Sequence, residues 1–408
     1  MRRLFSRSAP AANTAAGADR PSRLPLIALC ITEITSWGVL YYAFPVLASA
    51  ITADTGWSTP AVTAAFSASL VLAALIGIPA GRLLDRHGPR ILMTGGSLLA
   101  SASLALIATA PNLAWFTIAW LLAGIAQAAV LYQPAFAALT RYYAPRHLGA
   151  LTTLTLVAGL ASTVFAPLTD ALAAHLTWRH TYLVLAVLLA LITVPLHALG
   201  LRQPWPEAPK THGETPHGSV SAIVRSRAFL LLTAALTLSA FATYAVMINL
   251  IPLLTARGSS TTLAAWALGL GGVGQIAGRL GYGLLTRHTT ASARTVWILA
   301  LSAATTAALA IVPGPITLLI AISTLAGTAR GITTLLQATA ISDRWGTTAY
   351  GILSGILAAP VTIAGALAPW AGAALAATLG GYPALFTALT AAAVLAALLA
   401  VGSTPAKP

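Results

Sequence analysis

The stretch GRLLDRHGPR occupies residues 81–90 and decides the fold of this chain. Its ten residues hold three arginines, a histidine and an aspartate, although only 7% of the 408 residues are charged. A long apolar run precedes the stretch and another follows it. The sequence therefore places a short, strongly charged loop between two segments that avoid water.

Composition identifies the main solvent of this chain as a lipid bilayer. Hydrophobic residues make up 58% of the sequence and the mean hydropathy is +0.84, whereas a soluble domain is nearer half apolar and a quarter charged. The net charge of +14 would suit nucleic acid, but the basic residues lie mostly between apolar runs, as topology signals do. We therefore expect a membrane protein with no nucleic-acid partner.

Twelve segments are long and apolar enough to cross a bilayer, which takes about 20 residues. Alternation with a period of two is absent, so these segments are predicted to be helices rather than barrel strands. They are 25–50, 60–83, 91–110, 113–140, 148–174, 181–200, 228–254, 262–286, 294–312, 315–341, 349–378 and 382–401.

Basic residues set the expected topology. Five arginines precede residue 24 and further basic residues follow every even-numbered span, whereas the odd-numbered loops hold only Arg179 and Arg257. By the positive-inside rule, both termini are expected in the cytoplasm of a multi-pass protein of the plasma (inner) membrane. The expected parts are a disordered cytoplasmic tail at 1–23, a six-helix half at 24–201, a cytoplasmic linker at 202–225, a second six-helix half at 226–402 and a cytoplasmic tail at 403–408.

The two halves resemble each other in sequence. Three pairs of short motifs recur in the same order, at offsets of 201, 202 and 203 residues. The pairs are LLDRH at 83–87 with LLTRH at 284–288, FAP at 165–167 with LAP at 367–369, and AGIAQ at 123–127 with AGTAR at 326–330. Their nearly constant offset indicates a duplicated six-helix unit.

Two six-helix halves, a basic linker and a charged loop after the second span together resemble the major facilitator superfamily. The loop is similar to that family's signature at Gly81, Asp85, Arg86, Gly88 and Arg90. The resemblance implies an all-α membrane protein with twelve transmembrane helices in two pseudo-symmetric halves, working as a monomer. It also implies that the loop braces the two halves on the cytoplasmic side.

The residue types of the loop give it further expected roles. Gly81 would let the second helix approach a neighbour closely, and Asp85 would face an arginine or a helix N-terminus. Thr286 stands where the second copy would need the counterpart of Asp85. An acidic contact of this kind is therefore expected in one half only.

Glu33 lies within the first predicted span, where an ionisable side chain is costly and points to function. Glu33, Trp37 and Tyr41 are spaced by four residues, so they share one helix face. An acid beside aromatic rings suits a cavity wall, as a proton-coupling site or a substrate contact. The alternative is a glutamate whose carboxyl is satisfied by neighbouring Thr or Ser hydroxyls.

Arg279 and Arg330 lie in the eighth and tenth predicted spans. Gln275 shares the face of Arg279, and Gln337 continues the polar stripe of Arg330. A guanidinium stays charged and binds a carboxylate through two parallel hydrogen bonds, so two of them favour an anionic substrate. A structural role stays open for each arginine. The other candidates for the cavity wall are Gln127, Tyr132, Gln133 and Asn249.

Two branches of the superfamily can be compared with this sequence. Arg279, with Gly283 four residues later, resembles the arginine with which monocarboxylate porters and oxalate/formate antiporters bind a carboxylate. Gln275 stands where the porters have an aspartate, so Glu33 would have to supply any proton step. Drug antiporters differ more, because Trp120 replaces their fourth-span arginine and Ala166 replaces the glycine of their fifth-span motif.

The sequence therefore predicts a secondary active transporter that moves a small organic anion, a carboxylate, by alternating access with proton symport or exchange. A proton-coupled efflux antiporter for drugs or metabolites is the alternative. No nucleotide-binding P-loop is present, so ATP is not expected to drive transport. A membrane-embedded enzyme is disfavoured because the eight histidines are scattered and form no metal or triad constellation, and a non-transporting receptor is disfavoured as well. We expect no cofactor and no metal site, and the expected partners are the lipid bilayer, a small-molecule substrate and, if Glu33 titrates, protons.

Overall fold

The structure is a computed structural model that describes residues 23–144, 147–205, 217–346 and 350–404. These residues form helices and connecting turns, and no strand occurs among them. Most of the two predicted tails, at 1–22 and 405–408, lies outside the described residues. Ser403, at the start of the second predicted tail, is fully buried against the last helix, to which its Oγ donates a hydrogen bond.

The N-terminal half contains the first six predicted spans, of which the first, fourth and fifth are divided. The first span consists of α1 (Leu24–Trp37), the π-helical η1 (Gly38–Tyr42) and α2 (Ala43–Thr55). The others are α3 (Thr59–His87), α4 (Pro89–Ala108), α5 (Leu113–Val130) with α6 (Tyr132–Tyr142), α7 (His147–Ala158) with α8 (Ala161–Ala173), and α9 (Trp178–Gly200).

The C-terminal half follows a linker that itself contains a short helix, α10 (His217–Val224). Its six long helices are α11 (Arg227–Ala256), α12 (Thr261–His288), α13 (Ala291–Ile311), α14 (Ile316–Thr339), α16 (Tyr350–Leu379) and α17 (Tyr382–Val401). The four-residue helix α15 (Ser342–Trp345) follows α14.

Among the described residues, eleven helical segments are long and apolar enough to cross a membrane. The twelfth long helix is α12, whose 28 residues include Arg279, Arg287 and His288. Its length suits a span, and its reduced hydropathy comes from the polar and glycine residues that it carries. The all-helical architecture expected from the sequence is confirmed.

The break between α5 and α6 has a local cause. Leu131 is extended, with φ −91° and ψ −171°. Pro134 follows three residues later; its ring has no N–H for the carbonyl of Val130 and would clash with that carbonyl in a continuous helix. The helix of the fourth span is therefore interrupted at Leu131, between α5 and α6.

Several long helices begin at a residue whose side chain caps the first turn. Each of these Ser, Thr or Asn side chains accepts a hydrogen bond from the backbone N–H three residues later, which satisfies a donor that the helix leaves free. The caps are Ser58, Asn112, Thr177, Ser226, Ser260 and Thr290. They fix where α3, α5, α9, α11, α12 and α13 start.

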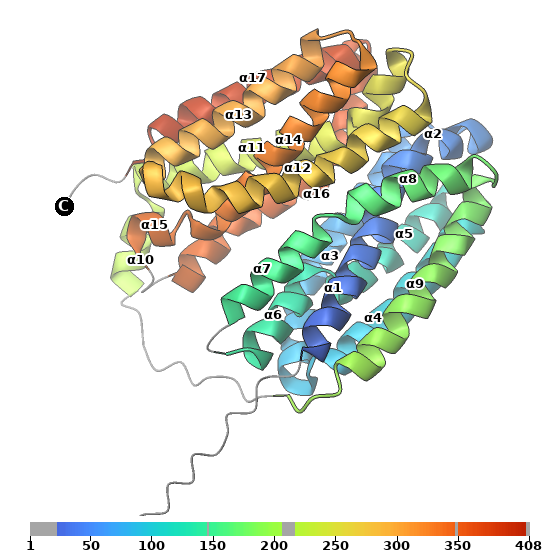
Figure 1. The fold of residues 1–408 in the computed structure, drawn as a ribbon, viewed down its shortest axis with the longest axis horizontal. Helices are drawn as coiled ribbons and strands as arrows, with labels where there is room; N and C mark the ends of the chain where they lie inside the picture. Colours follow the sequence, from blue (N-terminus) through green and yellow to red (C-terminus); the bar gives the residue numbers. More distant parts are fainter. Residues whose placement is uncertain (1–22, 145–146, 206–216, 347–349, 405–408) are drawn as a thin grey trace, which may run out of the picture.

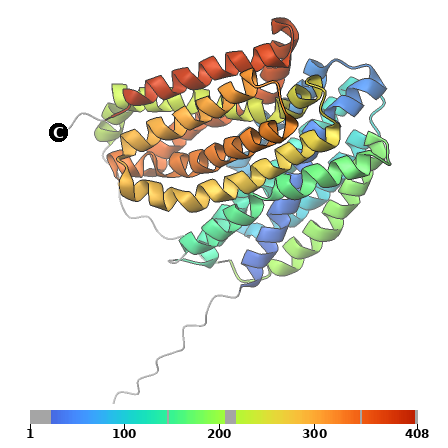
Figure 2. The same cartoon turned by 45° about the horizontal axis from the view of Figure 1, so that its top comes forward.

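The two halves lie side by side, and the start of α1, the end of α9, α10 and the end of α17 lie at one end of the molecule, here called the terminal end (Figure 1). Figure 2 shows the same two bundles from another angle. Two hydrogen bonds between the halves lie toward the opposite, far end: the Trp370 N–H donates to Ser67 Oγ at 3.0 Å, and Thr163 Oγ1 donates to the Gly269 carbonyl at 2.7 Å. In Figure 1 the ribbons of the halves diverge toward the terminal end.

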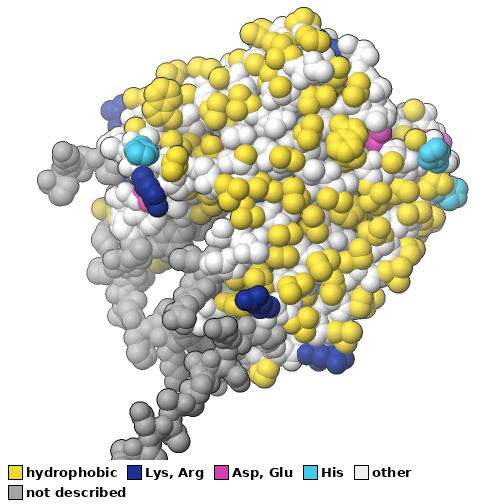
Figure 3. Space-filling view, in the orientation of Figure 1, with side chains coloured by type: hydrophobic (Ala, Val, Ile, Leu, Met, Phe, Trp, Pro, Cys, Tyr) yellow, Lys and Arg dark blue, Asp and Glu magenta, His cyan; other side chains and the backbone are white. Residues whose placement is uncertain are grey.

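The outer surface is that of a protein embedded in lipid. Hydrophobic side chains cover most of the visible face, and the few charged ones lie mostly toward the ends of the helices (Figure 3). Ile311 is 78% exposed and Leu191 is 71% exposed. Apolar side chains exposed to this degree over long helices need a bilayer to cover them.

Candidate functional site

The first span widens where the candidate site lies. Residues Gly38–Tyr42 form a π-helical segment, an insertion that often occurs at functional sites. Phe165 of α8 packs directly on Gly38, because a Cβ at residue 38 would lie 2.1 Å from the Phe165 ring. Only glycine allows this close approach, which fixes η1 against the fifth span.

Gln127 supports the widened segment from α5. Its Nε2 donates to the Leu40 carbonyl at 3.3 Å, so it satisfies a backbone group inside η1. Gln127 Oε1 is buried without a partner. The predicted cavity residue Gln127 is therefore placed against the backbone of the first span, with one polar atom unused.

Glu33 is fully buried, and neither carboxyl oxygen forms a hydrogen bond. The nearest hydroxyls in sequence are used elsewhere: Thr32 donates to the Leu29 carbonyl at 3.3 Å, and Thr35 donates to the Ile31 carbonyl at 2.8 Å. The idea that neighbouring hydroxyls satisfy Glu33 is therefore wrong. A buried polar group without a partner is rare, and an unpaired carboxyl at this depth marks a functional candidate.

Aromatic side chains surround Glu33. The Trp37 indole lies beside the carboxyl, outside good hydrogen-bonding geometry. Its ring is 5.4 Å from that of Tyr41 and 5.0 Å from that of Tyr132, measured between centroids. Trp37 thus contacts its expected face neighbour Tyr41 and also reaches α6. Tyr132 lies within electrostatic range of both Glu33 and Arg279.

Glycines bring α12 and α14 into backbone contact. A Cβ on Gly327 would lie 2.0 Å from the Gly271 carbonyl oxygen, and one on Gly331 would lie 2.2 Å from the Gln275 carbonyl oxygen. Small residues permit such close helix packing in membranes. The contact places the side chain of Gln275 next to that of Arg330.

Arg330 is held within the C-terminal half. With the Gln275 amide oriented so that its oxygen faces the guanidinium, Oε1 accepts from Arg330 Nε at 2.5 Å and from Nη2 at 3.2 Å. Arg330 Nη1 contacts Met247 Sδ of α11. Tyr41 and Tyr244 lie within electrostatic range, so the guanidinium faces both halves. Gln275 therefore pairs with Arg330, although it shares a helix with Arg279.

Arg279 bridges the two halves. Its Nη1 donates to the Thr155 carbonyl in the last turn of α7, and Gly159 just beyond that helix leaves room for the guanidinium. A cation at a helix C-terminus is favoured by the partial negative charge there. Arg279 Nε is buried without a partner. The structure therefore shows the structural role that the sequence left open for Arg279, because its Nη1 joins the two halves. Its Nε donates no hydrogen bond.

The site carries uncompensated positive charge. In the described part of the chain, ion pairs are formed by Asp54, Asp85 and Asp343. Neither Arg279 nor Arg330 takes part in one, although both lie within electrostatic range of Tyr244. Two guanidinium groups without a carboxylate partner, next to polar and aromatic side chains, can bind an anion.

Two predicted site residues lie apart from this cluster. Asn249 Nδ2 donates to the Ala245 carbonyl of its own helix at 2.8 Å, and its amide packs against Gly372 of α16. Gln337 is half-buried two turns beyond Arg330, toward the terminal end of α14. The structure does not bring either residue to the two arginines.

The signature loop makes its contacts inside the N-terminal half. Asp85 forms an ion pair with Arg141 of α6, and the Asp85 carbonyl accepts from the Trp205 indole at 3.2 Å. The Arg141 guanidinium lies over the Trp205 ring, 4.6 Å from its centroid. The expectation of an arginine opposite Asp85 is confirmed. The loop was expected to contact the other half on the cytoplasmic side. Its Asp85 carbonyl instead accepts a hydrogen bond from Trp205, at the start of the linker.

The other loop residues have separate roles. A Cβ on Gly81 would meet nothing within 4 Å, so the predicted close approach at Gly81 is wrong for this conformation. Gly88 has φ +78°, which favours glycine, and it ends α3 against Trp205. Arg90 Nε donates to the Ala198 carbonyl near the end of α9 at 2.8 Å. Arg86 is exposed.

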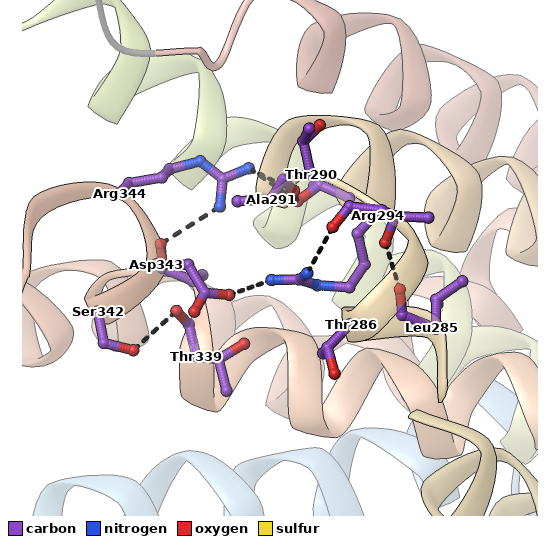
Figure 4. Close-up of polar contacts among 12 residues, drawn as sticks. Leu285, Thr286, Thr290, Ala291, Arg294, Thr339, Ser342, Asp343 and Arg344 are labelled. Atoms are coloured by element: carbon purple, nitrogen blue, oxygen red, sulfur yellow. Dashed lines mark hydrogen bonds and ion pairs between the residues drawn. The ribbon is translucent and has the colours of Figure 1, made fainter. Parts of the chain in front are cut away.

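The loop after α12 holds no counterpart of the Asp85 contact, as expected, because Thr286 Oγ1 donates to the Gly283 carbonyl at 2.8 Å. The C-terminal half has a different ion pair near the terminal end. Arg294 at the start of α13 pairs with Asp343 of α15 (Figure 4). Asp343 and Arg141 are separated by one of the repeat offsets, 202 residues. Arg294 has no such match, because Asp85 corresponds to Thr286 at the offset of 201. The pair of Arg294 with Asp343 therefore joins other elements than the pair of Asp85 with Arg141.

Replacing Asp343 with asparagine is expected to destabilise the protein. The Arg294 side chain is only 6% exposed and would lose its anionic partner, which costs about 1–3 kcal/mol for a buried charged donor. The matched control is Asp85→Asn, because the Asp85 side chain is 59% exposed and exposed pairs contribute about 0–1 kcal/mol. Thermal unfolding in detergent should show the larger drop in Tm for Asp343→Asn. Equal drops would contradict this account.

The chain was compared with known families and proteins. Residues 29–356 match the profile of the Major Facilitator Superfamily. A Bos taurus protein named monocarboxylate transporter 13 is 30% identical over 262 residues, which are 63% of this chain. The matching region spans 58% of that relative's length.

Two crystal structures of a bacterial homologue of the human lysosomal transporter Spinster share the fold. One is inward-facing and occupied, with a TM-score of 0.72 over 94% of this chain and 97% of that chain. The other is inward-facing and unoccupied, with a TM-score of 0.73 over 95% and 97%. Sequence identity is 17% in both cases, so they show the fold alone. Because the family profile covers most of the sequence, this chain belongs to the Major Facilitator Superfamily.

Proposed function

We propose that this protein is a secondary active transporter of a small organic anion, a carboxylate, working by alternating access with proton symport or exchange. One observation carries the proposal: Arg330 and Arg279 lie at the meeting of the two halves without a carboxylate partner among the described residues. A substrate carboxylate would supply the missing negative charge through paired hydrogen bonds. The relative named as a monocarboxylate transporter supports the same substrate class.

The arrangement of the halves supports alternating access. The hydrogen bonds that join them through Ser67 and Thr163 lie toward the far end, and the ribbons diverge toward the terminal end (Figure 1). The distribution of basic residues supports a topology in which the terminal end lies in the cytoplasm of a cell whose plasma (inner) membrane holds the protein. The conformation described here would then be open to the cytoplasm.

Glu33 is the proposed proton-coupling group. It is buried without a hydrogen-bond partner, and it lies near Tyr132, which is also in range of Arg279. A carboxyl group in this position could exchange a proton when the site opens to water on either side. If Glu33 keeps its proton throughout the cycle, the same site would work as an exchanger.

A lipophilic cation is the second candidate substrate, because Trp37, Tyr41 and Tyr132 form an aromatic wall beside an acid. Aromatic faces attract organic cations. Two guanidinium groups without a carboxylate partner among the described residues lie near the same wall and oppose a cation, which is why the anion is preferred.

Ligand-dependent thermal stability tests the proposal directly. Purified protein in detergent is heated with graded concentrations of small mono- and dicarboxylates, neutral sugars and lipophilic cations. A ligand that binds the folded state stabilises it by about 2.7 kcal/mol at one hundred times its Kd. We expect carboxylates alone to raise Tm. Stabilisation by lipophilic cations and not by carboxylates would overturn the proposal and make this chain a candidate efflux antiporter.

A further inference from the structure

A cavity lies inside the C-terminal half and is lined by residues of α11, α12, α13 and α14. Its volume is about 40 Å³, which holds about three water-sized groups. Arg330 and Met247, which contact each other, form part of the wall. The same two residues face the site between the halves, so the cavity begins directly behind the Arg330 guanidinium.

The corresponding space in the N-terminal half is filled. Phe44 and Phe66 stack with ring centroids 4.2 Å apart, and Trp120 meets the two rings edge-on at 5.5 Å and 5.0 Å. All three side chains are fully buried. They occupy the interior that α2, α3 and α5 enclose, which leaves no room for a ligand there.

The internal repeat explains the difference. Trp120 of α5 corresponds to Ser323 of α14 at the offset of 203 residues that relates AGIAQ to AGTAR, and Phe66 corresponds to Ala267 at the offset of 201 that relates LLDRH to LLTRH. Both Ser323 and Ala267 line the cavity. The offset of 203 residues also relates Gln127 to Arg330. The C-terminal half therefore has small residues in place of two aromatic rings, beside an arginine in place of a glutamine.

The wall is apolar with hydroxyl groups at a few points. Ser323 donates to the Leu319 carbonyl at 2.8 Å, and Thr306 donates to the Ser302 carbonyl at 2.8 Å. Ser302 Oγ has no partner, although that residue is only 9% exposed and lines the cavity. A buried hydroxyl without a partner costs free energy that a bound ligand or water could recover.

We infer that this cavity is a subsite for the carbon chain of a short monocarboxylate whose carboxylate Arg330 binds. The inference rests on the proposed function and narrows its substrate class. About three non-hydrogen atoms fit beyond the carboxylate, which corresponds to an acid of four carbons. Met247, flexible and apolar, lies beside Arg330 where the chain would enter. The N-terminal half offers no equivalent subsite, so the substrate lies asymmetrically between the halves.

Two substitutions at Ala267 test this subsite by making the cavity progressively smaller. Ala267→Val and Ala267→Leu partly restore the bulk that Phe66 provides in the other half. Kd values for acetate, propionate, butyrate, valerate and hexanoate are measured from the concentration dependence of Tm. We expect the wild type to bind butyrate most tightly, and each enlargement of residue 267 to move the optimum to a shorter acid. Ala267→Leu should weaken butyrate binding by about 10- to 200-fold, the effect of a misfitted methylene, and acetate binding by much less.

Leu325→Phe is the matched control, because Leu325 lies on α14 but is 47% exposed on the outer surface. It should leave the chain-length profile as in the wild type. If Ala267→Leu fails to fold, Ser323→Val narrows the same cavity with a smaller change in volume. Equal weakening for all five acids, or an unchanged optimum, would overturn the subsite while leaving the anion site intact. Absence of binding for every acid to the wild type would instead overturn the proposed function, and the subsite with it.

Discussion

Replacing Arg330 with glutamine is expected to abolish carboxylate binding while leaving a folded protein. The substitution removes the positive charge and the two-pronged hydrogen bonding that a carboxylate needs. Losing one partner of a buried charged pair costs about 2–5 kcal/mol, which is roughly 30- to 4,000-fold in Kd. The contacts of Arg330 in the structure are with Gln275 and Met247, which are neutral. Its replacement therefore leaves no unpaired acid behind, and the unliganded Tm should change little.

Two further variants define what the assay measures. Arg330→Lys keeps the charge without the planar fork, so it should bind carboxylates with an affinity between those of the wild type and Arg330→Gln. Arg287→Gln removes an exposed arginine from the last turn of α12 and should bind as the wild type does. Binding is read from carboxylate-dependent Tm shifts and from uptake into proteoliposomes. Normal uptake by Arg330→Gln would remove the anion site from this residue.

Arg279 is a poorer residue for the same experiment. Its guanidinium caps α7 through the Thr155 carbonyl, so it joins the two halves in this conformation. A substitution there would disturb both substrate binding and the balance between conformations, and the two effects would not separate. Arg330 contacts only its own half, which makes its loss easier to interpret.

Much of the fold could be predicted because hydrophobic runs and charge patterns report directly on the bilayer. The divided spans could not be predicted in the same way. The break at Leu131 follows from Pro134 in retrospect, but the π-helical segment at Gly38–Tyr42 depends on packing against Phe165. Contacts between distant segments decide such irregularities, and a hydropathy pattern does not contain them.

The site was predictable where it is made of ionisable residues. Glu33 and Arg330 stand out because charge is rare in this chain. Met247 and Tyr244 were missed because an apolar and an aromatic residue within a long apolar helix carry no distinguishing pattern. The pair of Arg294 with Asp343 was missed for another reason: it joins α13 to α15, outside the motifs that the internal repeat relates.

Replacing Glu33 with glutamine is expected to separate carboxylate movement from the proton gradient. Glutamine has nearly the same shape but cannot carry a proton, and Glu33 has no hydrogen-bond partner that the change would remove. A gradient of one pH unit stores about 1.4 kcal/mol per proton, enough for about tenfold accumulation of a symported substrate. Proteoliposomes with such a gradient should therefore accumulate carboxylate about tenfold with the wild type and not at all with Glu33→Gln.

Exchange across the same membranes provides the control. Labelled carboxylate outside should still exchange with unlabelled carboxylate inside in the Glu33→Gln variant, because that process needs the anion site and the conformational change but no net proton movement. Glu33→Asp, which keeps a titratable carboxyl group, should retain part of the accumulation. If Glu33→Gln accumulates carboxylate as the wild type does, the proton is carried elsewhere. If the wild type exchanges but never accumulates, the protein is an exchanger, and the unpaired carboxyl of Glu33 serves substrate binding instead.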